Sequence, residues 1–193
     1  MGILNLTPDS FFNQNIYPNK KKISNYIESL KTADIIDVGA ESTKPGSQSI
    51  SINKEIERLS IINDIDVKSM NLSIDSYKTE VIKYCIDRGF KIINDISGGG
   101  KNFENIDLAC EYNLPIVIMH MQGNPYSMQE NPKYDNIIDD IVSFFDVRLN
   151  YAIKIGFNIN NIILDPGIGF GKTINDNDNI ILNLDKFKQN KNL

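Results

Sequence analysis

The feature that most constrains the fold is a regular alternation of short apolar segments with longer amphipathic segments along the chain. The apolar segments are predicted to be strands and lie at 2–6, 34–38, 71–74, 91–96, 115–119 and 162–165. The segments predicted to be helices lie at 20–31, 54–67, 78–88, 103–112, 136–155 and 178–188. In the third of these, Val81, Ile82, Cys85 and Ile86 share one face, as in a helix that packs on a sheet. Strict alternation of apolar strands with helices predicts a parallel sheet in an α/β fold.

Polar and turn-forming residues follow every predicted strand. The strand ends carry Asn5, Glu41, Asp75, Asn94, Asp95, His120 and Asp165. This pattern is expected for a TIM (β/α)8-type barrel, whose active site is built from the βα loops at one rim. A doubly wound sheet would instead concentrate such groups at one switch point between strands. We therefore favour the barrel, with about six β/α units present.

Each of these polar residues also has a simpler structural role open to it. Asp75 can cap the helix that follows it, and Asn94 and Asp95 can close a turn through their side chains. Asp165 can be an ordinary loop aspartate before a proline, and His120 can be a packing residue. Caps and turns account for some of these residues, but they do not account for carboxylates and amides on so many strand tips.

The last strand runs into DPGIGFGKT at 165–173, which resembles a nucleotide phosphate loop. A phosphate loop needs Gly-x-x-x-x-Gly-Lys-Ser/Thr so that backbone N–H groups surround the phosphates. The first glycine of that pattern would fall at Pro166, which has no N–H and a restricted φ angle. The spacing predicts instead an aspartate at a strand tip, followed by a glycine loop that can approach a ligand closely.

Charge and composition exclude several function classes. The formal net charge of −5 argues against a nucleic-acid partner, because a phosphate backbone requires a basic surface. The sequence has no apolar stretch of membrane-spanning length and no signal-peptide pattern at its start. Cys85 and Cys110 are expected to be free thiols in a reducing cytoplasm. The single histidine, His120, makes a zinc site or a catalytic triad improbable. We expect a cytoplasmic protein with no nucleic-acid or membrane partner.

Six loop motifs resemble those of one enzyme family. They read NLTPDSF at 5–11, DVGAESTKPG at 37–46, SIDS at 73–76, NDISGG at 94–99, MHMQGNPYSMQENPKY at 119–134 and LDPGIGFGKT at 164–173. With these motifs in this order, nearly the whole chain resembles dihydropteroate synthase. This family of pterin-binding barrel enzymes acts in folate biosynthesis and is the target of sulfonamides.

The resemblance implies a transferase reaction. In this reaction p-aminobenzoate displaces pyrophosphate from 6-hydroxymethyl-7,8-dihydropterin pyrophosphate and gives 7,8-dihydropteroate. A pterin presents an edge of N–H donors, which suits carboxylate and amide acceptors. By the resemblance, Asp75, Asn94 and Asp165 bind that edge and form the catalytic set. Asp75 is the residue that we expect to stabilise positive charge on the ring in the transition state.

The resemblance also implies a magnesium site and a loop for the second substrate. Asn5 matches a residue at a magnesium-assisted pyrophosphate site, where Mg²⁺ would offset charge on the leaving group. Thr43, Lys44 and Pro45 match a loop that helps to hold p-aminobenzoate and pyrophosphate.

Three apolar residues complete the implied site. Phe11 matches a position near the aminobenzoate ring, and Met119 and Phe170 match apolar walls of the pterin pocket. One residue departs from the family pattern, because Lys44 stands where the family usually has arginine. Lysine cannot form the bidentate fork to phosphate or carboxylate, so weaker substrate binding is expected.

The chain is expected to be one partial pterin-binding barrel domain, 1–193, without strands 7 and 8. A complete barrel typically has about 250 residues, whereas this chain has 193. We therefore expect a C-terminally truncated chain whose activity depends on the missing part. The family is commonly homodimeric, but the helices of that interface are also expected to be absent.

Two other functions stay open. A methyltetrahydrofolate-dependent methyltransferase shares the barrel and the pterin carboxylates, although the loops at 7–11 and 41–46 favour the synthase. The chain can also be a noncatalytic pterin-binding module that is completed by a partner chain. An assay of pteroate formation distinguishes these functions.

Overall fold

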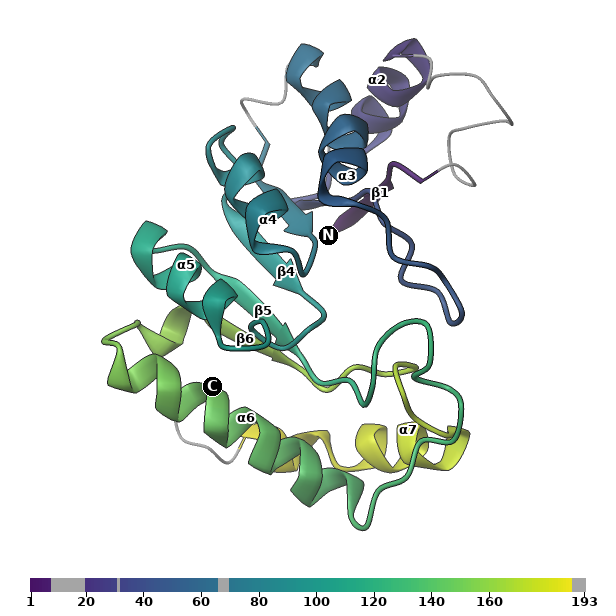
Figure 1. Ribbon diagram of the computed structural model, residues 1–193, viewed down its shortest axis with the longest axis vertical. Coiled ribbons are helices and arrows are strands. Elements are labelled where there is room, and N and C mark those ends of the chain that lie inside the picture. Colours follow the sequence, from purple (N-terminus) through teal and green to yellow (C-terminus); the bar gives the residue numbers. More distant parts are fainter. Residues whose placement is uncertain (8–19, 31, 66–69, 189–193) are drawn as a thin grey trace. The chain divides into compact units, whose positions relative to one another are not determined.

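Strands and helices alternate along the computed structural model, which describes residues 1–7, 20–30, 32–65 and 70–188 (Figure 1). The strands are β1 (Gly2–Asn5), β2 (Ile36–Gly39), β3 (Leu72–Asp75), β4 (Ile92–Asp95), β5 (Ile116–Met119) and β6 (Ile162–Asp165). The helices are α2 (Lys20–Ser29), α3 (Ile52–Leu59), α4 (Thr79–Ile86), α5 (Glu104–Tyr112), α6 (Ile137–Lys154) and α7 (Ile174–Leu182). Short 3-10 helices are η1 (Ser60–Asp64), η2 (Ile159–Asn161) and η3 (Leu184–Lys188). The alternation predicted from the sequence is confirmed. Among the described residues, no helix is both long enough and apolar enough to cross a membrane.

The described residues form two compact units. The first unit takes Met1–Ser42 and Ser49–Asn94, and the second takes Thr43–Gln48 and Asp95–Leu193. The strand ends that the sequence singled out are divided between these units.

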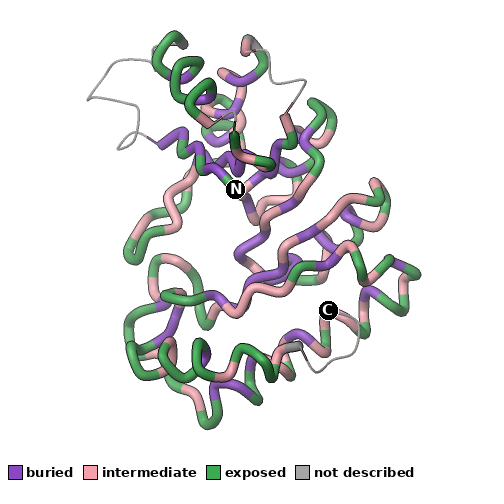
Figure 2. Tube along the Cα trace, turned by 180° about the vertical axis from the view of Figure 1, so that it is seen from behind, coloured by how far each residue is buried: buried purple, intermediate pink, exposed green. Residues whose placement is uncertain are grey.

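In the first unit, β1 to β4 pair in parallel and in chain order. All four residues of β2 and the first three of β3 are buried, as expected for strands that are covered on both faces. Figure 2 shows these strands as largely buried stretches of the chain. Their apolar side chains therefore form the core, while their carboxyl ends carry the polar residues.

Helix α4 packs in the first unit with the face predicted from its sequence. Val81, Ile82 and Cys85 are buried, and burial raises the pKa of the Cys85 thiol to about 12. Cys85 and Cys110 are both free thiols, and Cys110 is only partly buried.

In the second unit, β5 and β6 pair in parallel, and α6 and α7 share an apolar cluster. The cluster consists of Ile137, Ile138, Ile141, Phe145 and Ile180, with Leu164 of β6 packed against it. Burial of each such side chain contributes about 1.5–3 kcal/mol. The cluster therefore fixes α7, and with it the end of the loop that links β6 to α7.

Two helices begin earlier than the sequence predicted, because their capping residues were not recognised. Helix α3 starts at Ile52 rather than at residue 54, since the Ser51 side chain accepts a hydrogen bond from the Lys54 backbone N–H at 3.3 Å. Helix α7 starts at Ile174 rather than at residue 178, since Thr173 and Asp176 form a capping box. Helix α3 also ends at Leu59, where η1 replaces the predicted continuation to residue 67.

Candidate active site

Four residues form an aligned row at the carboxyl ends of β1 to β4 in the first unit. Asn5 aligns with Gly39, Gly39 with Asp75, and Asp75 with Asn94. Parallel strands place their carboxyl ends at the same edge of a sheet, where ligands of α/β proteins bind. The structure therefore brings Asn5, Asp75 and Asn94, three of the residues predicted from the sequence, into one row.

Gly39 makes room for the side chains on either side of it. A Cβ atom at Gly39 would lie 2.9 Å from Asp75 Oδ2 and 3.4 Å from Asn5 Oδ1. The missing side chain therefore leaves a space toward which an amide oxygen and a carboxylate oxygen both point. A larger residue at this position would displace the Asp75 carboxylate.

Asp75 is not the cap of the helix that follows it. The N-cap residue of α4 is Lys78, and its own side chain makes no capping hydrogen bond. Ser76, the other candidate cap, donates its hydroxyl to Glu55 Oε1 at 2.7 Å. Asp75 is therefore not the N-cap residue of α4, and it lies at the strand end, only partly buried.

Asn94 is oriented by an aspartate that sequence reasoning did not assign to the site. Asn94 Nδ2 donates to Asp37 Oδ2 at 2.9 Å, so the amide oxygen of Asn94 is directed away from that carboxylate. Asp37 is buried within β2, in register with Ser73. Burial raises the pKa of Asp37, and interactions with Ser73 and Asn94 partly oppose this effect. A charged residue inside an apolar strand was the available signal for this role.

Asp95 has the turn-closing role that was open to both residues of the Asn94-Asp95 pair. Its Oδ1 accepts from the Ser97 N–H at 2.7 Å and from the Ser97 hydroxyl at 2.6 Å. Its Oδ2 accepts from the Gly99 N–H and from Asn105 Nδ2, both at 2.9 Å. Adjacent residues thus differ in role, because Asp95 stabilises a loop and Asn94 lies in the strand-end row.

In the second unit, Asp165 ends β6 and aligns with Met119 at the end of β5. Asp165 Oδ1 accepts a hydrogen bond from the Gly167 N–H at 2.7 Å, and the residue is partly exposed. Met119 is buried, and Phe170 is partly buried in the loop that follows Asp165. This unit therefore pairs one carboxylate at a strand end with an adjacent apolar residue.

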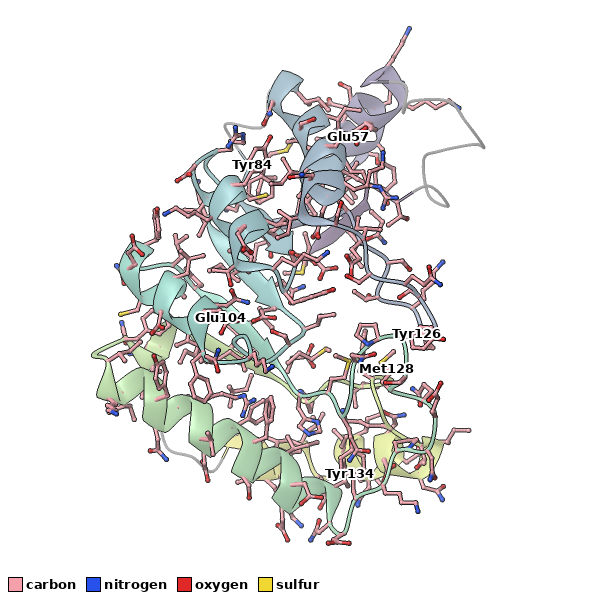
Figure 3. All side chains as sticks on the ribbon, in the orientation of Figure 1. Glu57, Tyr84, Glu104, Tyr126, Met128 and Tyr134 are labelled. Atoms are coloured by element: carbon pink, nitrogen blue, oxygen red, sulfur yellow. The ribbon has the colours of Figure 1, made fainter. Side chains whose placement is uncertain are left out.

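The buried Lys172 side chain stabilises this glycine loop through hydrogen bonds to backbone carbonyls. Its ammonium group donates to the carbonyls of His120 at 3.1 Å and Phe170 at 2.9 Å. Burial lowers the pKa of Lys172 to about 8, although Asp165 and Asp176 oppose the shift. The Tyr134 hydroxyl, labelled in Figure 3, donates to the Gly171 carbonyl at 2.6 Å. Lys172 is therefore a structural residue of the loop.

His120 has the packing role that was open to it. Its ring makes an edge contact with Phe144, with ring centroids 4.9 Å apart. Burial, together with the charges of Lys172 and Arg148, lowers the pKa of His120 to about 3. The imidazole is thus neutral at physiological pH and is not set up for acid–base catalysis.

The loop predicted to hold the second substrate lies between β2 and α3. Thr43 is partly exposed, and Lys44 and Pro45 are exposed. Within the second unit, the Ser47 N–H donates to the Lys44 carbonyl at 3.0 Å, and the Gly46 N–H donates to the Pro125 carbonyl at 3.1 Å. Phe11 lies outside the described residues.

The oxygen atoms above Gly39 suit a hard cation. Mg²⁺ prefers oxygen ligands and usually combines one or two protein ligands with waters and substrate phosphates. Within the described part of the chain, no group of three or more His, Cys, Asp or Glu side chains can hold a metal ion. Asn5 Oδ1 supplies one such oxygen beside Gly39.

Comparison with protein families adds a finding that covers the whole chain. The model of the pterin binding enzymes matches residues 1–193. The chain belongs to this family. A curated relative, the dihydropteroate synthase of Streptococcus pyogenes, is 39% identical over 189 residues, which are 96% of this chain and 68% of that protein.

Solved structures of the family share the fold. The Yersinia pestis dihydropteroate synthase with a sulfonamide drug matches with a TM-score of 0.84 at 33% identity, covering 97% of this chain and 70% of that one. The Xanthomonas albilineans dihydropteroate synthase with 4-aminobenzoic acid matches with a TM-score of 0.83 at 29% identity, covering 96% and 67%. The predicted family and the predicted incomplete α/β barrel are thereby confirmed.

Proposed function

We propose that this protein is a dihydropteroate synthase. It joins 6-hydroxymethyl-7,8-dihydropterin pyrophosphate to p-aminobenzoate and releases pyrophosphate. The observation that carries the proposal is the strand-end row of Asn5, Gly39, Asp75 and Asn94. Relatives that match nearly the whole chain bear this enzyme name, and the Xanthomonas albilineans relative binds 4-aminobenzoic acid.

The pterin ring is recognised through acceptors at the strand ends. Asp37 takes one N–H of the Asn94 amide, so the Asn94 oxygen is presented as an acceptor next to the Asp75 carboxylate. The resemblance to the family assigns Asp165, at the end of β6, to pterin binding as well. The resemblance to the family assigns Met119 and Phe170 to the apolar walls of the pterin pocket.

The reaction forms a C–N bond and breaks a C–O bond. The amine of p-aminobenzoate attacks the methylene carbon of the pterin, pyrophosphate leaves with the bonding electrons, and the new amine loses a proton. Positive charge develops on the pterin as the C–O bond breaks. The Asp75 carboxylate beside the ring stabilises this charge more in the transition state than in the ground state.

The leaving group and the second substrate are held by Asn5, at the end of β1, and by the loop between β2 and α3. Asn5, together with pyrophosphate oxygens, would hold Mg²⁺, which offsets the negative charge that develops on the leaving group. Thr43, Lys44 and Pro45 contact p-aminobenzoate and pyrophosphate. Lys44 contributes a single ammonium charge there rather than a bidentate fork.

The synthase is favoured over the two alternatives. A methyltetrahydrofolate-dependent methyltransferase would share the pterin carboxylates, but the relatives with 39% and 33% identity are dihydropteroate synthases. A noncatalytic pterin-binding module would bind the pterin substrate without turning it over. Turnover therefore separates the second alternative from the synthase.

The experiment is the substitution Asp75→Asn in the protein as its gene encodes it, assayed with Mg²⁺ and both substrates. We expect pterin affinity to fall at least about tenfold, since a hydrogen bond to a charged group contributes roughly 1.5–3 kcal/mol. We expect dihydropteroate formation to fall at least about 100-fold, as for loss of one transition-state contact. The matched control is Asp87→Asn, an exposed aspartate at the end of α4, with unchanged kinetics.

Two outcomes would overturn parts of the proposal. Unchanged kinetics of Asp75→Asn in an active enzyme would show that Asp75 has no role in pterin binding. Pterin binding by the wild-type protein without any dihydropteroate formation would instead favour the noncatalytic module.

A further inference from the structure

A buried ionic cluster adjoins the strand-end row of the first unit, because its member Ser76 immediately follows Asp75 in the chain. We call it the Lys78 cluster, and it consists of Glu41, Glu55, Ser76, Tyr77 and Lys78. The side chain of Glu55 is 1% exposed, that of Glu41 is 8% exposed and that of Lys78 is 11% exposed. None of these residues belongs to the substrate-binding set proposed above, so the cluster requires a separate explanation.

Lys78 connects three segments of the chain through one ammonium group. Its Nζ contacts the carboxylate of Glu41, which follows β2. It also contacts Glu55 Oε2 on α3 at 2.6 Å and donates to the Ile50 carbonyl at 2.8 Å. An ammonium group has three N–H donors, and three acceptors surround this one. Lys78 therefore links three segments of the chain in one buried arrangement, unlike a surface ion pair.

Glu41 and Ile50 lie on the two sides of segment 42–49, which contains Thr43, Lys44 and Pro45. The Ile50 N–H donates to Glu41 Oε2 at 3.0 Å, and the Tyr77 hydroxyl donates to Glu41 Oε1 at 2.8 Å. Both backbone groups of Ile50 are thus used, one by Glu41 and the other by Lys78. The two ends of the segment are closed onto each other and onto the turn at Tyr77 and Lys78.

Glu55 extends this connection to the end of β3. Its Oε1 accepts the hydroxyl of Ser76 at 2.7 Å, and Ser76 immediately follows Asp75. The Lys78 N–H lies 3.3 Å from Ser76 Oγ and donates to it. The chain that leaves Asp75 and the chain that enters and leaves segment 42–49 therefore meet in one network.

Stability is a weak explanation for this cluster. Two buried carboxylates share one lysine, and desolvation of such groups often offsets their attraction. Burial alone would lower the pKa of Lys78, but the hydrogen bonds and charges of Glu41 and Glu55 outweigh it and raise that pKa. Lys78 thus stays charged, and the network specifies one geometry, as buried polar groups do when every partner is present.

We propose that Lys78 is a positioning residue that holds both ends of segment 42–49 at the carboxyl end of β3, beside Asp75. The inference rests on the proposed function, because that function assigns Thr43, Lys44 and Pro45 to the second substrate. Lys78 does not touch substrate. It acts by fixing Glu41 and Ile50, so that binding of p-aminobenzoate does not have to order the base of the loop.

The test compares Lys78→Met with Lys54→Met in the protein as its gene encodes it. Lys54 is exposed on α3 and pairs in a surface contact with Glu57, which is labelled in Figure 3, so the control removes the same charge from the same region. We expect Lys78→Met to raise the KM for p-aminobenzoate at least about tenfold, the factor that corresponds to one charge-assisted hydrogen bond. We expect the pterin Kd to change by less than about twofold, a difference too small to reflect a lost hydrogen bond.

Hydrogen exchange at Ile50 gives a readout that does not depend on catalysis. Because the Ile50 N–H is bonded to Glu41, its exchange should accelerate at least about tenfold in Lys78→Met, as the local opening free energy falls. Exchange in α4 of the same variant should be unchanged. Lys54→Met should match the wild-type protein in all of these measurements.

A second variant covers the case in which Lys78→Met does not fold because two carboxylates stay buried without a cation. Glu41→Gln leaves one carboxylate with Lys78 and keeps the side-chain shape, and we expect the same changes with smaller size. Unchanged KM for p-aminobenzoate and unchanged Ile50 exchange in both variants would overturn the inference. Absence of dihydropteroate formation by the wild-type protein would count against the proposed function instead, and Ile50 exchange would still decide the role of Lys78.

Discussion

The β6–α7 loop contains two glycines that allow a matched test of how Asp165 is held. Gly167 and Gly169 both have positive φ angles, +69° and +83°. A Cβ atom at Gly169 would meet nothing within 4 Å, whereas one at Gly167 would overlap the carbonyl oxygen of His120 and lie 3.2 Å from Lys172 Nζ. Alanine at either position has the same backbone cost, but only Gly167→Ala also forces the loop away from β5.

The expected magnitudes follow from the contacts of each glycine. A left-handed backbone costs alanine about 1–2 kcal/mol, and the smaller entropy of its unfolded chain offsets about 0.4–1 kcal/mol. Gly169→Ala should therefore destabilise the protein by about 1 kcal/mol. Gly167→Ala should also break two hydrogen bonds. One runs from the Gly167 N–H to Asp165 Oδ1 at 2.7 Å, and the other from Lys172 Nζ to the His120 carbonyl at 3.1 Å. Each involves a charged group, so the added loss is about 3 kcal/mol or more.

Urea unfolding of the two variants and the wild type measures this difference. The free energy of unfolding of Gly167→Ala should lie about 3 kcal/mol below that of Gly169→Ala. Dihydropteroate synthesis should also decrease more in Gly167→Ala, because the Asp165 carboxylate loses its backbone partner. Equal destabilisation by the two substitutions would refute the reasoning, since it would mean that the backbone conformation alone determines the cost.

Two further predictions concern the same unit. Because the folded-state pKa of His120 is about 3, below its ordinary value of 6.5, the stability it contributes is complete above pH 6.5. That stability is lost as the pH falls toward 3, by at most about 1.4 kcal/mol per pH unit. His120→Gln should reduce the loss of stability between pH 6.5 and 5. The imidazole NMR signals of the wild-type protein should not titrate near pH 6.5. A titration midpoint near pH 6.5 would contradict a buried, neutral His120 ring. Thr173→Ala should lower the free energy of unfolding by about 1 kcal/mol, because it removes the N-cap of α7. Thr173→Ser is the control, since serine keeps the capping hydroxyl. Equal stability of the two variants would show that the cap does not stabilise the protein.

The order and type of the elements were predictable because burial on both faces leaves a strong signal in the sequence. The apolar runs around Ile36, Ile74 and Ile118 read as strands, and each is buried in the structure. Helix starts were less predictable, because they depend on single side chains. Ser51 and Thr173 each cap a helix whose first residues do not yet show the apolar periodicity. The periodicity alone therefore predicts a start that is too late in the sequence.

The site was predictable in its residue types but not in the division of labour among neighbours. Asn94 and Asp95 looked equivalent as turn residues, yet only Asp95 closes the loop. Asp75 looked like a possible helix cap, and only the position of Lys78 as N-cap excludes that role. Asp37 was missed because its partner, Asn94, is distant in sequence and becomes visible only when β2 and β4 are placed in one sheet. Such pairings depend on strand register, which a single sequence does not specify.

The Gly171-Lys172-Thr173 segment has the sequence of the end of a phosphate loop, but its polar groups have partners within the protein. In a phosphate loop the lysine and the adjacent hydroxyl and N–H groups face the ligand. Here the Lys172 ammonium donates to two backbone carbonyls, and both the N–H and the hydroxyl of Thr173 donate to Asp176, at 2.9 and 2.7 Å. The groups that would bind phosphate therefore close the loop and begin α7. Since Lys172 also binds the carbonyl of His120, next to the strand pair of Met119 and Asp165, these bonds hold the loop so that a carboxylate, rather than a cation, stands at the end of β6.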